Sequence, residues 1–416
     1  MEGKPDPSSV IKIPELLLNI LKYLEGDTKS LLSALLVNRT WFECGVTIAW
    51  KNATVASLAA ASEENRPIYA SSIRHIGCNT SFQASLQAKV KDLEFTNLRS
   101  FSIETYRLLQ DEDLYLEQYI RPTLESIHLY GSGLGSKFFT AVQLRCRRLR
   151  ELTLDSPGHE LTSEHFLEFL RGCSALSQLS LLYGIENIVS DDVVVHLASR
   201  DNLRTLSLGP VIDSRLMERI VVDVSNPFQH TKDLRLSLTS TALHLITPHL
   251  SSLTVLELTV KDNEHSALEH VTSLRNLQRL TINYAMNTNL SSAELLSLKH
   301  LTNLEAITLN GMQHEMNTFN LDCFQFTDSE FETLLSSLPR LSRLNFGVQC
   351  MLTSTALKTV AKYCPRIDTL QILVPIETTI LRPESVDQEP MLPELHTLDL
   401  VGFDRPADVS PDDEEV

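Results

Sequence analysis

The hexapeptide LRTLSL at residues 203–208 decides the fold, because its spacing of apolar residues recurs along most of this chain of 416 residues. The hexapeptides LQRLTI (277–282) and LEAITL (304–309) carry the same spacing. In each, the fourth and sixth residues are apolar and two apart, which places both on one face of a short β-strand. The fourth position of this motif is filled in turn by Ile76, Phe101, Ile127, Leu152, Leu179, Leu206, Leu234, Leu256, Leu280, Ile307, Leu344, Leu370 and Leu398.

These fourth positions follow one another at 22 to 28 residues, except that Ile307 and Leu344 are 37 residues apart. An L-x-x-L-x-L core at a period of about 20–29 residues is typical of a leucine-rich repeat. We therefore expect an α/β solenoid over residues 72–403 with about 13 units, a curved parallel sheet inside and helices outside. The long interval predicts an insertion near residues 311–326.

Helical stretches lie between the expected strands, and each begins with Ser or Thr, as helices often do. Thr327 with Glu330 fits a capping box. The last connection, 374–393, contains four prolines and predicts an extended loop, and residues 404–416 form an acidic tail with six acidic residues. The helical stretches are 163–173, 190–199, 327–338 and 353–364.

The charge balance limits the partners. Lys plus Arg number 36 against 53 Asp plus Glu, a formal charge of −17, so phosphate backbones and anionic membrane surfaces repel the chain. We expect no nucleic acid and no membrane as partner. The first residues lack an apolar signal segment, no run suits a membrane span, and seven cysteines is an odd number. A reduced, intracellular protein of the cytoplasm and/or nucleus is expected.

The cysteines predict packing rather than chemistry. Cys146, Cys173 and Cys364 each stand three residues before the first Leu of a unit, and the same slot elsewhere holds residues such as Phe95 and Leu250. A slot that accepts Leu, Phe or Cys is a buried apolar slot, where Cys acts as a small hydrophobe. We expect neither a metal site nor a cofactor.

The string GSGLGS at residues 131–136 offers a weak case for an enzyme. Gly131 and Gly133 match a dinucleotide-binding motif, but Ser136 replaces the third glycine, and Asp155 lies where a ribose-binding acid would be sought. The same strand–turn–helix unit recurs many times without glycines, so a turn in a repeat explains the motif better. A nucleotide-dependent enzyme remains a remote alternative.

No other motif favours catalysis or nucleic-acid binding. The basic run RCRRLR (145–150) stands where a helix ends, and cations stabilise that end. His244 with His249, and His265 with His270, are five residues apart, a spacing that does not place two zinc ligands on one helix face. No catalytic residue is assigned.

The solvent-facing positions of the strands are the expected contact surface. The column after the fourth positions is mostly small and polar, and the outward-facing Arg235, Arg279 and Arg343 lie in different units. Exposed apolar residues and the insertion favour a protein-binding site in the C-terminal third, at the ends of the strands. The alternative is that Phe324 and Phe326 only pack the insertion onto its own unit. The expected substrate-binding residues are Met312, Met316, Phe319, Leu373 and Val401.

Residues 10–52 differ from the repeats, because their apolar residues recur at spacings of three and four and predict three short helices. The segment 13–50 resembles an F-box, which opens with an apolar residue and Pro, continues with leucine-rich helices, and contains Val-x-Arg-x-Trp and a late Trp. Ile13 replaces the usual Leu and Asn38 the frequent Cys. The matching residues are Pro14, Glu15, Leu17, Ile20, Leu21, Leu24, Leu31, Leu35, Val37, Arg39, Trp41 and Trp50.

The resemblance to the F-box/leucine-rich-repeat family implies a non-catalytic substrate receptor of a Skp–cullin–F-box ubiquitin ligase. The F-box would bind the Skp adaptor, and through it a cullin, while the repeats recruit a protein substrate for ubiquitination and proteasomal degradation. The repeats lack the usual Asn or Cys after the strand, where Tyr106, Ser132, Pro157 and Gly184 stand. The adaptor-binding residues it implies are Ile13, Pro14, Leu17, Ile20, Leu21, Leu24, Leu31, Leu35, Val37 and Trp41.

Two other interpretations remain open at this point. The chain can be a leucine-rich-repeat scaffold that acts outside a ubiquitin ligase, and residues 10–52 can be a helical cap for the first unit. These helices carry more apolar residues than a segment of about 40 residues can bury alone, which favours a partner. Residues 53–71 are expected to be a linker.

Overall fold

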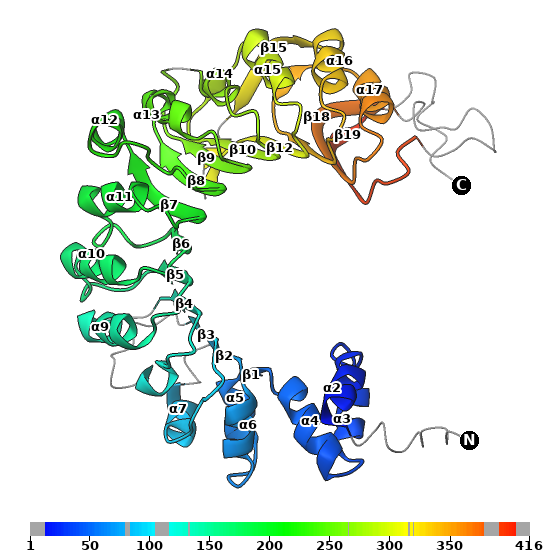
Figure 1. Ribbon diagram of the computed structural model, residues 1–416. Helices are drawn as coiled ribbons and strands as arrows, with labels where there is room; N and C mark the ends of the chain where they lie inside the picture. The colour runs from blue at the N-terminus through cyan, green and yellow to red at the C-terminus, as the bar shows by residue number, and fades with distance from the viewer. Residues whose placement is uncertain are drawn as a thin grey trace, which may run out of the picture. The chain divides into compact units, whose positions relative to one another are not determined.

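The structure is a computed structural model that describes residues 13–79, 84–104, 116–131, 134–264, 266–314, 317–318, 320–377 and 391–404. The chain divides into two compact units, residues 1–193 and 194–416. The lead 1–9, most of the acidic tail and most of the proline-rich connection lie outside the described residues. Figure 1 shows the elements of both units along the chain.

The first unit begins with the three short helices that the sequence predicts. Pro14 occupies the first turn of its helix, where its missing N–H costs nothing. The carboxylate of Asp27 accepts from the Ser30 N–H, and the amide oxygen of Asn38 accepts from the Trp41 N–H, so both later helices are capped. The helices are α2 (Pro14–Lys22), α3 (Thr28–Leu35) and α4 (Arg39–Ala49).

Residues 53–71 are structured, contrary to the expected linker. Strand β1 (Asn52–Thr54) pairs in parallel with β2 (His75–Asn79), and helices α5 (Val55–Ala60) and α6 (Arg66–Ser72) follow it. Ala53, rather than a larger residue, lies opposite Ile76. The sequence pattern did not predict β1 as the strand of a repeat, because residues 52–54 lack the L-x-x-L-x-L core.

The remaining strands of the first unit lie side by side in parallel, and the fourth positions of the motif align. Ile76 pairs with Phe101, which pairs with Ile127, and Leu152 and Leu179 continue the row. The strands are β3 (Ser100–Glu104), β4 (Ser126–Tyr130), β5 (Glu151–Asp155) and β6 (Gln178–Leu181); the helices are α7 (Ala84–Val90), η2 (Leu116–Tyr119), α9 (Ser136–Arg145) and α10 (Ser163–Gly172), and α11 (Asp191–Ala198) contains the division between units.

The second unit repeats the arrangement with the same register. Leu206, Leu234, Leu256 and Leu280 are paired in turn, and Ile307, Leu344, Leu370 and Leu398 continue the row. The strands are β7 (Thr205–Ile212), β8 (Asp233–Leu238), β9 (Val255–Val260), β10 (Arg279–Tyr284), β12 (Ala306–Gly311), β16 (Arg343–Phe346), β18 (Thr369–Glu377) and β19 (Thr397–Asp404).

Helices alternate with the strands of the second unit. The Glu330 carboxylate accepts from the Thr327 N–H, which confirms the predicted capping box. The expected helices over 327–338 and 353–364 are confirmed as α16 and α17. The helices are α12 (Ser214–Asp223), α13 (Ser240–Ile246), η3 (Thr247–His249), α14 (Ala267–Val271), α15 (Ser292–Ser297), η4 (Leu298–His300), α16 (Asp328–Ser336) and α17 (Thr355–Tyr363).

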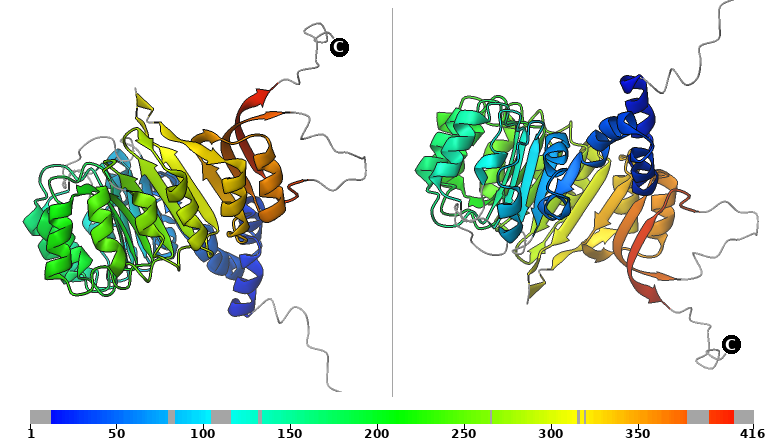
Figure 2. Two further views of the ribbon diagram at one scale, coloured as in Figure 1. Left: turned by 90° about the horizontal axis from the view of Figure 1, so that it is seen from above. Right: turned by 90° about the horizontal axis from the view of Figure 1, so that it is seen from below.

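The main sheet contains fourteen strands in the described residues, in the order of the chain, and confirms the α/β leucine-rich-repeat fold. Within each unit the helices cover one face of the sheet (Figures 1 and 2). We call the other side the open face. The fourth and sixth positions, such as Leu206 and Leu208, are buried against the helices, while Ser207 between them faces out. No described helix is long and apolar enough to cross a membrane.

The insertion near 311–326 forms strands rather than a loop. Strands β13 (Gln313–His314) and β14 (Asn317–Thr318) pair antiparallel. Strand β15 (Leu321–Thr327) lies between β11 (Thr288–Asn289) and β17 (Gln349–Met351), which makes a second sheet of three parallel strands. Phe326 is buried against Phe331 and Phe346, whereas Phe324 is exposed.

The register predicts which positions carry stability. Replacing Leu206 or Leu256, both fully buried, with Ala should lower the free energy of unfolding by about 2–5 kcal/mol. Ser207 and Thr281, on the open face, should tolerate Ala within about 0.5 kcal/mol. Urea unfolding followed by circular dichroism measures both pairs, and equal losses would contradict the register.

Candidate functional site

Helix α2 has two apolar faces, and one of them is exposed. Ile13, Leu16, Ile20 and Tyr23 follow at spacings of three, four and three, which places them on one side of the helix. Their exposed fractions are 45%, 40%, 45% and 89%. We call these four residues the α2 stripe. Such a row of large apolar side chains on a surface indicates a partner-binding site.

The other face of α2 is the core of the three helices. Leu17 and Leu21 are 0% exposed and pack with Leu31, Ala34 and Cys44. The helices approach closely at Gly45, where an added Cβ would lie 2.4 Å from Leu35 Cδ2. Leu17 and Leu21 therefore have no surface to present, although the sequence placed them with Ile20 in one contact set.

The other expected adaptor-binding residues divide in the same way. Leu31 and Leu35 are buried, Leu24 and Trp41 are partly buried, and Ile13, Pro14, Ile20 and Val37 are exposed. The structure adds exposed apolar residues that the sequence analysis did not select: Leu16 and Tyr23 on α2, and Leu32 and Leu36 beside Val37. The spacing of Leu32 and Leu36, one helical turn, was the available signal.

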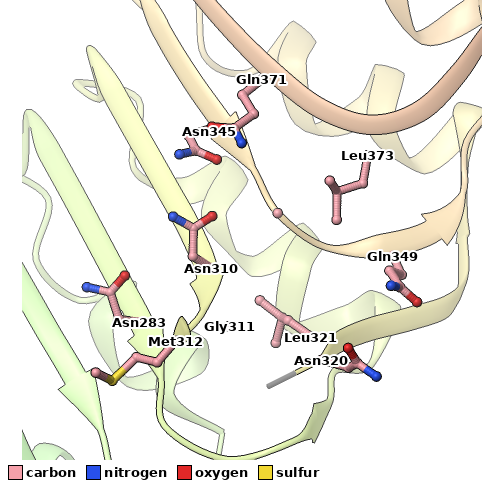
Figure 3. Close-up of a pocket in the computed structure, with 11 residues that line it drawn as sticks. Asn283, Asn310, Gly311, Met312, Asn320, Leu321, Asn345, Gln349, Gln371 and Leu373 are labelled. Carbon is pink, nitrogen blue, oxygen red and sulfur yellow. The ribbon is translucent and has the colours of Figure 1, made fainter. Parts of the chain in front are cut away.

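A second candidate site is a pocket of about 570 Å³ on the second unit, at the carboxyl ends of β10, β12 and β16 and beside the first half of β18. Asn283, Asn310, Asn345 and Gln371 contribute one amide from each strand, and Figure 3 shows them along one side of the pocket. We call this cavity the amide pocket. Its volume lies in the range of ligand sites, about 300–1,000 Å³.

A glycine makes room for the pocket. Gly347 follows β16 and donates its N–H to the Leu309 carbonyl at 2.8 Å. A Cβ at this position would lie 2.4 Å from Asn310 Oδ1 and 2.8 Å from the Leu309 carbonyl oxygen. Any larger residue would therefore push into the space that Asn310 occupies.

Two residues of the expected substrate site line this pocket. Met312 and Leu373 contribute apolar surface together with Leu321 of β15 (Figure 3). Met316 and Phe319 lie outside the described residues, as does the side chain of Val401 on β19. The four amides were not selected from the sequence, because their proximity depends on the register across four strands.

The amide pocket carries no charge among its lining residues. Ion pairs lie elsewhere on the open face: Arg235 Nε lies 3.1 Å from Glu257, and Arg343 Nε lies 3.4 Å from Asp368. The pocket therefore offers hydrogen bonds and apolar contact rather than an ionic attraction.

The open face of the first unit holds a Ser–His pair. Ser126 Oγ lies 2.8 Å from His128 Nε2 and donates its single hydrogen to Glu151 Oε2 at 3.0 Å. His128 Nδ1 contacts Thr153 Oγ1 at 3.1 Å. With the serine hydrogen directed to Glu151, His128 does not accept it, so the chain of bonds does not activate the serine as a nucleophile.

The nucleotide motif has structural roles where it is described. Gly131 adopts a φ of 72° and donates to the Asp155 carbonyl. The Asp155 carboxylate accepts from the N–H groups of Leu182 and Tyr183 in the next repeat. Ser132 and Gly133 lie outside the described residues. Asp155 is thus engaged by the backbone of its neighbouring repeat.

The histidines form no metal site in the part of the chain that the structure describes. His244 and His270, on adjacent helices, bring their Nδ1 atoms to 3.3 Å. Sequence spacing missed this contact because it joins two repeats. His265 lies outside the described residues.

The chain was compared with known proteins. No family model and no curated protein matches it. The crystal structure of the Rad7 and Elc1 complex in yeast aligns at a TM-score of 0.48 with 13% identity, over 96% of this chain and 98% of that chain. The TLR13–ssRNA13 complex aligns at 0.39 with 12% identity, over 80% and 54%. A leucine-rich-repeat protein of Leptospira interrogans aligns at 0.41 with 13% identity, over 82% and 81%. These TM-scores are too low to support an argument about function.

The cysteines of the repeat slot are buried, as expected, and this predicts their reactivity. Burial raises the pKa of the Cys146 thiol to about 11 and that of Cys364 to about 12. A pKa of about 11 leaves about one thiol in 1,000 ionised at pH 8, and the thiolate is the reactive form. The native chain should therefore react slowly with Ellman's reagent at pH 8 and fast in urea. Rapid reaction of all seven thiols without urea would contradict the buried slot.

Proposed function

We propose that this protein is the substrate-recognition subunit of a Skp–cullin–F-box ubiquitin ligase. In this proposal the N-terminal helices bind the Skp adaptor, and the repeats bind a protein that is to be ubiquitinated. The observation that carries it is the second apolar face of α2: Ile13, Leu16, Ile20 and Tyr23 remain exposed although the helices have a complete core. The F-box-like sequence of residues 13–50 supports the same assignment.

The distribution of polar and apolar residues on α2 supports an interface over a cap. A cap needs one apolar face, directed at the repeat that it covers. Here Leu17 and Leu21 form the buried apolar face of α2, packed against the other two helices. The α2 stripe lies on a different side of the helix. Exposed Leu32 and Leu36 extend the apolar surface available to a partner.

The repeats provide the other half of the proposed adaptor. The amide pocket combines polar groups with Met312, Leu321 and Leu373, a mixture that suits recognition of a protein segment. The proposal assigns no chemical step to this chain, because the transfer of ubiquitin would be performed by other subunits.

The pocket also favours a second candidate function, a leucine-rich-repeat binding protein that acts outside a ligase. Its residues lie on β10 to β18 and do not depend on the N-terminal helices. Affinity purification of the intact chain with cullin activity blocked separates the two functions. The ligase proposal expects both the Skp adaptor and a cullin in the complex, and their absence would favour the second candidate.

The α2 stripe gives a direct test of the adaptor interface. Ile20→Asp places a charge in the centre of the stripe and should reduce the affinity for the Skp adaptor at least about a hundredfold, because burying an unpaired charge costs several kcal/mol. Lys22→Gln, which changes the net charge equally on the polar side of the same helix, should leave binding within about threefold. Isothermal titration with purified adaptor measures both.

The buried residues of α2 serve as the structural control for this test. Leu17→Asp would place an unpaired charge in the core of the three helices and should reduce their helix content in circular dichroism. Loss of adaptor binding in that variant would report unfolding rather than contact. Undiminished binding by a folded Ile20→Asp chain would show that the interface lies elsewhere.

A further inference from the structure

The amide pocket presents hydrogen-bonding groups in two pairs, which are offset along the strands by two residues because Asn345 lies opposite Thr308. Asn283, Asn310, Asn345 and Gln371 come from four strands that are neighbours in the sheet, and Asn283 pairs with Asn310 while Asn345 pairs with Gln371. A side-chain amide carries donor and acceptor groups together. Among the described residues, the side chains of these four make no hydrogen bond to each other or to a neighbour.

Asn345 indicates what a ligand has to supply. Its Oδ1 atom is buried and has no hydrogen-bond partner. A buried acceptor without a donor is unfavourable, so a turn of the Asn345 side chain that brings this atom to an N–H or O–H group of a ligand is favoured. The residue lies on β16, beside Gln371 of the neighbouring strand (Figure 3).

We propose that the amide pocket binds an extended, uncharged segment of a partner protein through the main chain of that segment. This inference rests on the proposed role in recruiting a protein and specifies the chemistry of what is recruited. Each peptide unit of an extended chain offers one N–H and one C=O, which are the complements of a side-chain amide.

The dimensions fit a short segment. Neighbouring strands lie about 4.8 Å apart, so the three steps from β10 to β18 span about 14 Å. The offset of two residues adds about 7 Å along the strands, so the four amides span about 16 Å, which an extended peptide with a rise of about 3.3 Å per residue crosses with about five residues. Leu321 and Leu373, on the side of the pocket opposite the amides (Figure 3), then accommodate an uncharged side chain of the segment.

The lack of charge in the amide pocket excludes recognition of a phosphate or carboxylate group. A phosphate or carboxylate entering this pocket would lose its water without meeting a cation, since neither Arg nor Lys lines it. Arg343, on β16, lies 3.4 Å from Asp368 and is paired. Recognition by this pocket therefore requires no phosphorylation of the partner.

The test begins with a displayed library of random, unphosphorylated linear dodecapeptides, selected on the intact chain. The expected result is a family of peptides that share about five consecutive uncharged residues. Their affinity, measured by fluorescence anisotropy, should fall roughly tenfold in Asn345→Ala and in Gln371→Ala. Thr281→Ala, also on the open face but outside the pocket, is the matched control and should bind within about threefold.

Backbone recognition is then examined directly. A selected peptide is synthesised with one backbone N–H methylated at a time, and separately with Ala at each position. Methylation at two or more core positions should weaken binding roughly tenfold, while Ala at the same positions should change it by less than about threefold. Peptides that depend on charged residues, peptides that tolerate every methylation, or a selection without dependence on Asn345 would overturn the proposal.

The outcome is distinguishable from that of the adaptor proposal. The Ile20→Asp chain should bind the selected peptides with unchanged affinity, because α2 contributes nothing to the amide pocket. If the intact chain binds the adaptor but no Asn345-dependent peptide, only the peptide inference fails. If it binds such peptides but not the adaptor, the peptide inference stands and the ligase role fails.

Discussion

Register between neighbouring parallel strands is the constraint on which the structure depends. A single strand–helix unit has one apolar face and no core, so its leucines are buried only when the strands before and after align with it. Within the second unit, Leu206, Leu234 and Leu256 occupy one row and are all buried. A slip by one residue would turn every such leucine to the open face.

This constraint explains how much of the fold the sequence could predict. Alternation fixes which residues of each strand face the helices, so the row from Ile76 onward follows from spacing alone, and the pairing confirms it. Strand β1 was missed because Ala53 stands where the pattern needs a large apolar residue. The insertion was located correctly, but its strands were not foreseen; β15 pairs with segments far away in the sequence.

The candidate sites were less predictable, because both depend on contacts between elements. Spacing alone cannot tell that Leu17 is buried and Ile20 exposed, because both residues fit a helical period. Packing of α2 against α3 and α4 decides which side of the helix is buried. The amide pocket exists because Gly347 lies against Asn310, a contact across 37 residues. Met312 and Leu373 could be selected for their exposure, whereas the amides look like ordinary polar residues of an open face until the strands are aligned.

The second sheet has a mechanical consequence for the pocket beneath it. Strand β15 is hydrogen-bonded to β11 on one side and to β17 on the other, so it ties the segments after β10, β12 and β16 together at their carboxyl ends. Because two sheets join these three repeats, the repeats resist rotation and translation relative to one another more than repeats joined by a single sheet. The strands that carry Asn283, Asn310 and Asn345 are thereby held at fixed spacing before any ligand arrives, which reduces the ordering that binding requires.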